Sequence, residues 1–257
     1  MNQSLSNSKP WFVCPLIKPN ADTRLFLFPY AGSGPTAFSK WPAELPGTTE
    51  TWVAHYPGRG SRHNEAPIKE LATLTEEICL AIQPLLDKPF ALFGHSLGAL
   101  IAFELTRCLR QNAFPLPDAL FVSACSAPHL PDPHPPIHAL PDTEFLRALQ
   151  ELNGIPAEVA KLPELMELLL PTLRADFEVA ESYQYISNAY ELTCPIVAFG
   201  GNDDPRVSRE RLEGWASLTD GCFKSQYFPG DHFFINTIRE SVIASIVTEL
   251  TSSYAKR

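Results

Sequence analysis

The segment Gly94–Gly98 has the sequence G-H-S-L-G, with a serine between two glycines. The run Phe90–Phe93 before it is apolar and typical of a strand, whereas Ala99–Phe103 after it is typical of a helix. A G-x-S-x-G motif in this setting forms a sharp turn that exposes the serine hydroxyl above the sheet, and its glycines allow a turn that a Cβ would hinder. Outside this setting the motif is an ordinary glycine-bounded turn. We therefore predict that Ser96 is a nucleophile and that the backbone N–H of Leu97 stabilises an oxyanion.

A serine nucleophile needs a base within hydrogen-bond reach and an acid that orients the base. In this architecture the chain order is serine, acid, histidine. Among seven histidines only His232 lies beyond the last strand-like run, directly before the final helical stretch, so we predict it as the base. His95 is next to Ser96 and should project away from it, and His55 either lines the pocket or packs structurally. The others precede the acid candidates: His63, His129, His134 and His138.

The acid is expected in the loop that follows the strand-like run Pro195–Phe199. Asp203 and Asp204 are adjacent there, and both cannot point at one imidazole. Asp204 precedes a proline, which favours an extended backbone, while Asp203 would face solvent or cap the next helix. Spacing alone separates the two only weakly, and Asp231 is too close in sequence to His232 to orient it easily.

A second oxyanion donor is expected from the glycine-rich loop Phe28–Gly34, which follows the first buried strand. We predict the backbone N–H of Ala31 for this role, the alternative being a plain turn. The loop histidines His129, His134 and His138 are separated by prolines and lack nearby carboxylates at ligand spacing, so no metal site is expected.

Short apolar runs alternate with helical stretches along the chain, a pattern that predicts a doubly wound α/β fold with a mostly parallel central sheet and helices on both faces. Functional groups should then gather beyond the carboxyl ends of the strands. The expected strands are 25–28, 51–54, 90–93, 119–122, 195–199 and 225–228, and the expected helices are 69–86, 97–111, 207–218 and 235–252.

The alternation is interrupted between about 128 and 190. A proline-rich stretch, 128–136, is followed by helical segments at 142–153 and 157–185, the second of which has apolar residues at three- and four-residue spacing. Pro171 should divide this segment into two helices. We predict a helical lid inserted over the pocket within a single domain spanning 1–257, the alternative being an additional packing layer.

Composition excludes several classes of protein. The chain of 257 residues is 45% hydrophobic with a net charge of −9, which fits a globular protein and argues against nucleic acid as a partner. No run approaches the ~18 apolar residues that span a bilayer, and the first residues lack the features of a signal peptide. We expect a cytoplasmic location with no membrane association. The six scattered cysteines are expected to be free thiols.

Several motifs together resemble the stand-alone type II thioesterases of polyketide and non-ribosomal peptide assembly lines, and the resemblance extends over nearly the whole chain. The most specific are F-P-Y-A-G and P-G-R-G. The segments that carry the resemblance are Leu27–Gly32, Tyr56–Arg62, Gly94–Ala99, Leu173–Phe177 with Tyr183, Phe199–Gly201 with Asp204, and Gly230–Phe234.

The resemblance implies an α/β-hydrolase fold and the catalytic residues Ser96, Asp204 and His232, with Asp204 favoured over Asp203 as the acid. It also implies oxyanion donors at Ala31 and Leu97. The substrate it implies is an acyl thioester on the phosphopantetheine arm of a carrier protein, which requires no cofactor of the enzyme itself. Such enzymes clear stalled or mis-primed carriers.

Carrier proteins are commonly acidic, as this chain is, so docking would need a local basic patch. Arg59 and Arg62 follow a strand on the expected active-site side and are candidates for its rim, although Arg59 could equally pair internally. Two other functions remain open on sequence grounds: a general carboxylesterase or lipase, and a thioesterase that releases the finished product of the same pathway. A non-catalytic carrier-docking module is disfavoured because no member of the triad is missing.

Overall fold

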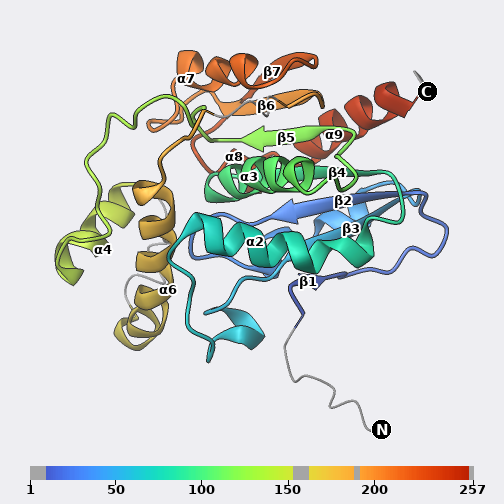
Figure 1. The fold of residues 1–257 in the computed structure, drawn as a ribbon. Helices are drawn as coiled ribbons and strands as arrows, with labels where there is room; N and C mark the ends of the chain where they lie inside the picture. Colours follow the sequence, from blue (N-terminus) through green and yellow to red (C-terminus); the bar gives the residue numbers. More distant parts are fainter. Residues whose placement is uncertain (1–9, 153–161, 188–191, 255–257) are drawn as a thin grey trace, which may run out of the picture.

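The computed structural model describes residues 10–152, 162–187 and 192–254. Within these residues a seven-stranded sheet has the order β1-β3-β2-β4-β5-β6-β7 (Figure 1). The short β1 is antiparallel to β3, and every other pair of neighbours is parallel. The strands are β1 Phe12–Val13, β2 Thr23–Phe28, β3 Thr49–Ala54, β4 Phe90–His95, β5 Leu120–Ser123, β6 Ile196–Gly201 and β7 Phe223–Phe228. The predicted mostly parallel sheet is confirmed.

The central strands are apolar along their whole length because both faces of the sheet are covered. Successive side chains point to opposite faces, and β2 shows the consequence: Phe26 and Phe28 pack in one hydrophobic cluster, Leu25 and Leu27 in the other. The first cluster lies under α2 and α3 and the second under α1, α8 and α9. Helices therefore cover both faces.

The longer helices agree with the predicted stretches in position, although several end earlier or continue as 3-10 turns, whereas α1 and the 3-10 helices before α2 were not predicted. They are α1 Trp41–Glu44, α2 Leu71–Ile82, α3 Leu97–Gln111, α4 Asp142–Glu151, α6 Pro163–Ser182, α7 Arg209–Glu213, α8 Phe234–Thr237 and α9 Arg239–Tyr254, with 3-10 helices at Pro35–Phe38, Gly60–Arg62, Gln83–Leu85 and Gly214–Leu218. The short β1 had no counterpart in the predicted strands.

An insertion separates β5 from β6, and its described part contains α4 and α6 beyond the edge of the sheet where the strand arrows end (Figure 1). The insertion has its own small hydrophobic cluster, centred on Phe145, Leu149, Met166 and Leu173. Glu181 of α6 also accepts hydrogen bonds from the backbone N–H groups of Ile137 and His138. The two helices and the preceding loop thus support one another.

The prediction that Pro171 divides the long segment into two helices was wrong, because α6 continues through it. An interior proline removes one backbone hydrogen bond and costs roughly 3 kcal/mol. Pro171 itself is exposed, whereas Thr172, Ala175 and Val179 of the same helix are buried. We infer that the contacts of this buried face offset the cost of the proline. Residues 153 and 157–161 of the predicted lid helices lie outside the described part of the chain.

None of the helices in the described residues is long and apolar enough to cross a membrane.

Candidate active site

Ser96 lies in the turn between β4 and α3 with φ +54°, a left-handed conformation that non-glycine residues seldom adopt. The residues two positions before and after Ser96 must be glycine, because there is no space for a side chain at either position. A Cβ on Gly94 would lie 2.1 Å from the carbonyl oxygen of Gly98, and a Cβ on Gly98 would lie 2.0 Å from that of Phe28. The turn is fastened to the sheet by the Ser96 N–H, which donates to Ser123 O at 2.8 Å. The predicted strand–turn–helix geometry is present.

Three side chains from separate loops form a hydrogen-bonded chain. His232 Nε2 lies 3.0 Å from Ser96 Oγ, and His232 Nδ1 lies 2.8 Å from Asp204 Oδ2. Both contacts are satisfied when Nδ1–H donates to the carboxylate and the serine hydroxyl donates to Nε2, the arrangement that a general base requires.

Asp204 is held firmly, because its side chain is fully buried and its second oxygen accepts from the backbone N–H groups of Arg206 and Val207 at 2.8 and 3.3 Å. Asp203, the other sequence candidate, is exposed and does not cap the next helix, whose N-cap is Ser208. The structure therefore places Asp204, and not Asp203, against the imidazole.

His95 is buried on the other side of the turn from Ser96, where its Nδ1 lies 2.9 Å from Ser123 Oγ. Burial, and to a lesser extent the nearby His232, lowers the pKa of His95 well below its ordinary value. A neutral, buried imidazole bonded to β5 fits a structural role, in agreement with the expectation that it projects away from the serine.

Both predicted oxyanion donors line the same cavity as Ser96 and His232. Leu97 is the first residue of α3, so its N–H has no carbonyl partner within the helix and is available at the helix N-terminus. Ala31 is the second residue of a turn, Tyr30–Ser33, closed by the Ser33 N–H donating to Tyr30 O at 3.0 Å. The placement of both residues is compatible with the predicted roles.

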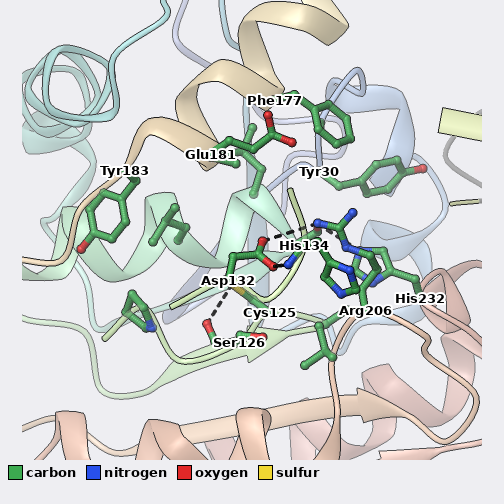
Figure 2. A pocket seen from close by; sticks show the side chains of 18 of the residues that line it. Tyr30, Cys125, Ser126, Asp132, His134, Phe177, Glu181, Tyr183, Arg206 and His232 are labelled. Carbon is green, nitrogen blue, oxygen red and sulfur yellow. Dashed lines mark hydrogen bonds and ion pairs between the residues drawn. The ribbon is translucent and has the colours of Figure 1, made fainter. Parts of the chain in front are cut away.

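A cavity of about 650 Å³ opens above Ser96. Its lining comes from the two predicted oxyanion segments, the loop after β5, and α4 and α6 of the insertion, together with residues that follow β6 and β7. Apolar side chains such as Leu100, Leu173 and Phe177 stand beside charged ones. Figure 2 shows Asp132 beside Arg206 in the lining of this cavity, joined by an ion pair with 3.6 Å between their charged atoms.

Arg59 and Arg62 do not lie on the rim, contrary to the sequence expectation. Their side chains are only 8% and 6% exposed. Arg59 forms a two-fold ion pair with Asp176 at 2.7 and 2.8 Å, and Arg62 pairs with Glu65 and donates to His55 O. Buried guanidinium groups need such partners because an unpaired charge in the interior is costly. The internal pairing considered for Arg59 is what the structure contains.

The remaining histidines all lie in the described part of the chain, and His63 among them is exposed, with Nδ1 3.1 Å from Gly60 O. His55 is buried, with Nε2 3.0 Å from Arg59 O, so its role is packing and not pocket lining. His129 and His134 line the cavity, and His138 Nδ1 lies 2.6 Å from Glu181 Oε2. The described part of the chain contains no group of three or more side chains that could together hold a metal ion.

Several cavity residues were not predicted from the sequence. Asp132 and His134 lie in the proline-rich stretch, and Arg206 lies two residues after the triad acid. Only the path of the loop after β5 brings the first two toward Arg206, and no local sequence pattern announces that path. Cys125 also lines the cavity, and burial raises the pKa of its thiol to about 12, so it is a poor nucleophile at neutral pH.

Comparison with known proteins identifies the class to which this fold and site belong. The family model for the thioesterase domain matches residues 23–250, so the chain belongs to the thioesterase family and is a thioester hydrolase with an α/β-hydrolase-like fold.

Individual relatives narrow the class. The chain is 42% identical over 246 residues to the gramicidin S biosynthesis protein GrsT of Aneurinibacillus migulanus, covering 96% of each chain. BorB, a type II thioesterase from the borrelidin biosynthetic cluster, superposes with a TM-score of 0.86 at 33% identity, covering 95% of this chain and 100% of BorB. RedJ, a thioesterase of the prodiginine pathway in Streptomyces coelicolor, superposes with a TM-score of 0.85 at 34% identity, covering 95% and 96%.

Proposed function

We propose that this protein hydrolyses acyl thioesters from the phosphopantetheine arm of carrier proteins in a polyketide or non-ribosomal peptide assembly line, and so returns stalled or mis-primed carriers to use. The observation that carries the proposal is the hydrogen-bonded chain Ser96–His232–Asp204 at the base of a cavity of about 650 Å³. The similarity to GrsT and to type II thioesterases from such clusters supports the substrate class.

In the first step, the Ser96 hydroxyl attacks the thioester carbonyl carbon while His232 Nε2 takes its proton. Asp204 keeps the imidazole in the tautomer that can accept at Nε2 and stabilises the imidazolium that forms. The carbonyl oxygen becomes negatively charged and would be held by the N–H groups of Ala31 and Leu97. Collapse of this intermediate breaks the C–S bond, and the imidazolium returns its proton to the departing thiol of the carrier.

In the second step, the acyl group is an ester on Ser96 and water enters the site. His232, neutral again, takes a proton from the water as it attacks the ester carbonyl. The same two N–H groups would stabilise the second oxyanion, and expulsion of the serine oxygen, which regains its proton from His232, releases the free acid. The enzyme needs no cofactor in this scheme because the carrier brings the phosphopantetheine.

The insertion acts in this proposal as the lid over the acyl group. Leu149, Leu173 and Phe177 belong to the insertion's own hydrophobic cluster and also line the cavity. Apolar side chains at these positions suit an acyl chain, so the packing of the insertion would determine which acyl groups fit.

The proposal is tested with a panel of carrier proteins loaded with different acyl groups, following release of free acid. We expect carrier-bound thioesters to be hydrolysed with far higher kcat/KM than small aryl esters of the same acids, and Ser96→Ala to abolish release while retaining the native circular dichroism. Higher activity on aryl esters would instead indicate a general esterase, and activity only on the full-length product would indicate a product-releasing enzyme. Release that persists in Ser96→Ala would contradict the proposed nucleophile.

A further inference from the structure

A buried carboxylate of the insertion contacts the turn that carries one predicted oxyanion donor. Asp176 of α6 is 3% exposed. Its Oδ2 accepts from the backbone N–H of Gly32 at 2.7 Å, in the turn Tyr30–Ser33 that contains Ala31. Both of its oxygens also accept from Arg59. A residue 144 positions away in sequence therefore holds the peptide that directly follows Ala31.

The conformation of the turn explains why an external partner matters. Gly32 has φ +73°, the left-handed value that the third position of a type II turn requires. The N–H of Gly32 belongs to the central peptide of the turn and is not used by the hydrogen bond that closes it, from Ser33 N–H to Tyr30 O. Asp176 fixes the orientation of this central peptide. Because the peptide includes the carbonyl group of Ala31, the backbone of Ala31 is thereby held on its C-terminal side.

Two further contacts hold α6 against the turn Tyr30–Ser33. The Arg59 guanidinium donates to Ser33 O at 3.1 Å as well as to Asp176. Leu173, one turn of α6 before Asp176, packs so tightly on Gly32 that a Cβ there would lie 2.3 Å from Leu173 Cδ2. Helix, arginine and turn therefore form one closely packed unit beside Ser96.

We propose that Asp176 is a positioning residue for catalysis: through the Gly32 N–H it aims the Ala31 N–H at the oxyanion, so that the site is fully competent only when α6 is seated on the turn. This inference rests on the proposed hydrolytic mechanism and assigns the insertion a part in it beyond covering the acyl group. Asp176 is not proposed to exchange protons with the substrate, because its two oxygens are occupied by Arg59 and Gly32.

The energetic expectation follows from what an oxyanion donor contributes. Complete loss of one donor lowers kcat by about 10²–10³-fold. Tyr30 has ring contacts with His95 and Phe233 that do not involve Asp176, so we expect the turn of a variant at position 176 to retain part of its orientation. Removing the acceptor for Gly32 should therefore displace the donor without abolishing it, and we expect kcat to fall by about 10–100-fold.

The test compares two double variants that both lack the ion pair. In Arg59→Met/Asp176→Asn, the amide oxygen can still accept from the Gly32 N–H, whereas in Arg59→Met/Asp176→Leu no acceptor remains and the side chain is similar in size. Neither variant leaves a buried charge unpaired. With an acyl-N-acetylcysteamine thioester as substrate, we expect kcat of the leucine variant to be about 10–100-fold below that of the asparagine variant, with KM within about twofold.

A second readout distinguishes positioning from a loss of structure. A trifluoromethyl ketone analogue of the substrate forms a tetrahedral oxyanion on serine, so its affinity should fall in parallel with kcat if the oxyanion site is displaced. Thr172→Val is the matched control: the Thr172 hydroxyl also ties α6 to a neighbouring loop, by donating to Gly58 O at 2.7 Å, but this hydrogen bond does not involve the turn. We expect its kcat and inhibitor affinity to stay within about twofold of the parent protein's.

The proposal is overturned if the two double variants have equal kcat, if inhibitor affinity is unchanged while kcat falls, or if Thr172→Val loses as much as the leucine variant. Should either double variant not fold, Asp176→Glu replaces the comparison, since it keeps the charge and moves the acceptor by one methylene; unchanged kcat would then contradict the proposal. The small thioester requires no carrier, so failure of the carrier assignment leaves this test intact, whereas failure of Ser96→Ala to abolish turnover removes the mechanism itself.

Discussion

The loops at the edge of the sheet and the insertion after β5 differ in what determines their structure. Ser96, Asp204 and His232 each lie within four residues of the end of a strand, and their positions are set by a sharp turn or by backbone hydrogen bonds a few residues away. The cavity side of the insertion is set instead by distant partners, such as Arg59 with Asp176, 117 positions apart in sequence. The catalytic residues are thus positioned by local structure, whereas the position of the insertion above them depends on long-range packing.

This difference assigns the two regions different parts in the reaction. Changes at the sheet edge should act on the chemical step, because they alter the groups that move protons. Changes in the insertion should act on which acyl groups are accepted, except at Asp176, where the two regions meet.

Apart from the loss of the nucleophile in Ser96→Ala, the largest effect is expected at the sheet edge, from Asp204→Asn. The amide would favour the wrong imidazole tautomer, with Nε2 protonated and unable to accept from Ser96, so kcat should fall by about 10³–10⁴-fold. Asp203→Asn is the matched control, since this neighbouring side chain is exposed. Steady-state hydrolysis of a small thioester measures both variants; comparable losses in the two would show that the loop, and not the Asp204–His232 contact, carries the effect.

An intermediate effect is expected from Phe177→Ala in α6. The ring lines the cavity and packs edge-on against Phe145, with centroids 5.7 Å apart, so its removal enlarges the space for the acyl group. We expect the ratio of kcat/KM for branched or long acyl thioesters to that for acetyl to rise by about tenfold, the scale of one or two methylenes in a pocket.

Leu168→Ala is the control for this experiment, because Leu168 is on the same helix and 62% exposed. Its acyl preference should match that of the parent protein. An unchanged preference in Phe177→Ala would indicate that the insertion is only a packing layer.

The smallest effect is expected from Pro171→Ala, which restores a backbone N–H in the interior of α6. Since Pro171 is exposed and the helix continues through it, alanine should increase the free energy of unfolding, by about 2 kcal/mol once the lost rigidity of the unfolded chain is considered. Urea denaturation measures the change. Destabilisation would show that α6 requires the proline at this position.

The loops at the edge of the sheet and the insertion also differ in how much of their structure could be predicted from the sequence. The turn at Ser96 was predicted because its cause is local: glycines that tolerate no Cβ, between an apolar strand and a helix. His232 was predicted from chain order. The choice of Asp204 needed the family resemblance, because two adjacent aspartates differ only in which one the backbone points inward.

Two errors of different kind concern Arg62 and Pro171, and one question left open concerns Arg59. Arg59 pairs with Asp176, 117 positions away, and no spacing pattern matches these two residues. Arg62 was expected at a rim because its loop follows a strand, but it is buried and pairs with Glu65, only three residues away. Pro171 was expected to end a helix because local propensity disfavours it there. The buried face of α6 outweighs that preference, and only tertiary contacts reveal it.

The buried pair of Arg59 and Asp176 sets a condition for exchanging parts between relatives. Substrate preference invites the construction of chimeras, in which the segment between β5 and β6 is grafted from another enzyme. A graft that brings a neutral residue to position 176 would strand a guanidinium in the interior, at a cost of about 3–5 kcal/mol. Successful hybrids should therefore transfer the loop that contains Arg59 together with the grafted segment, as a single module.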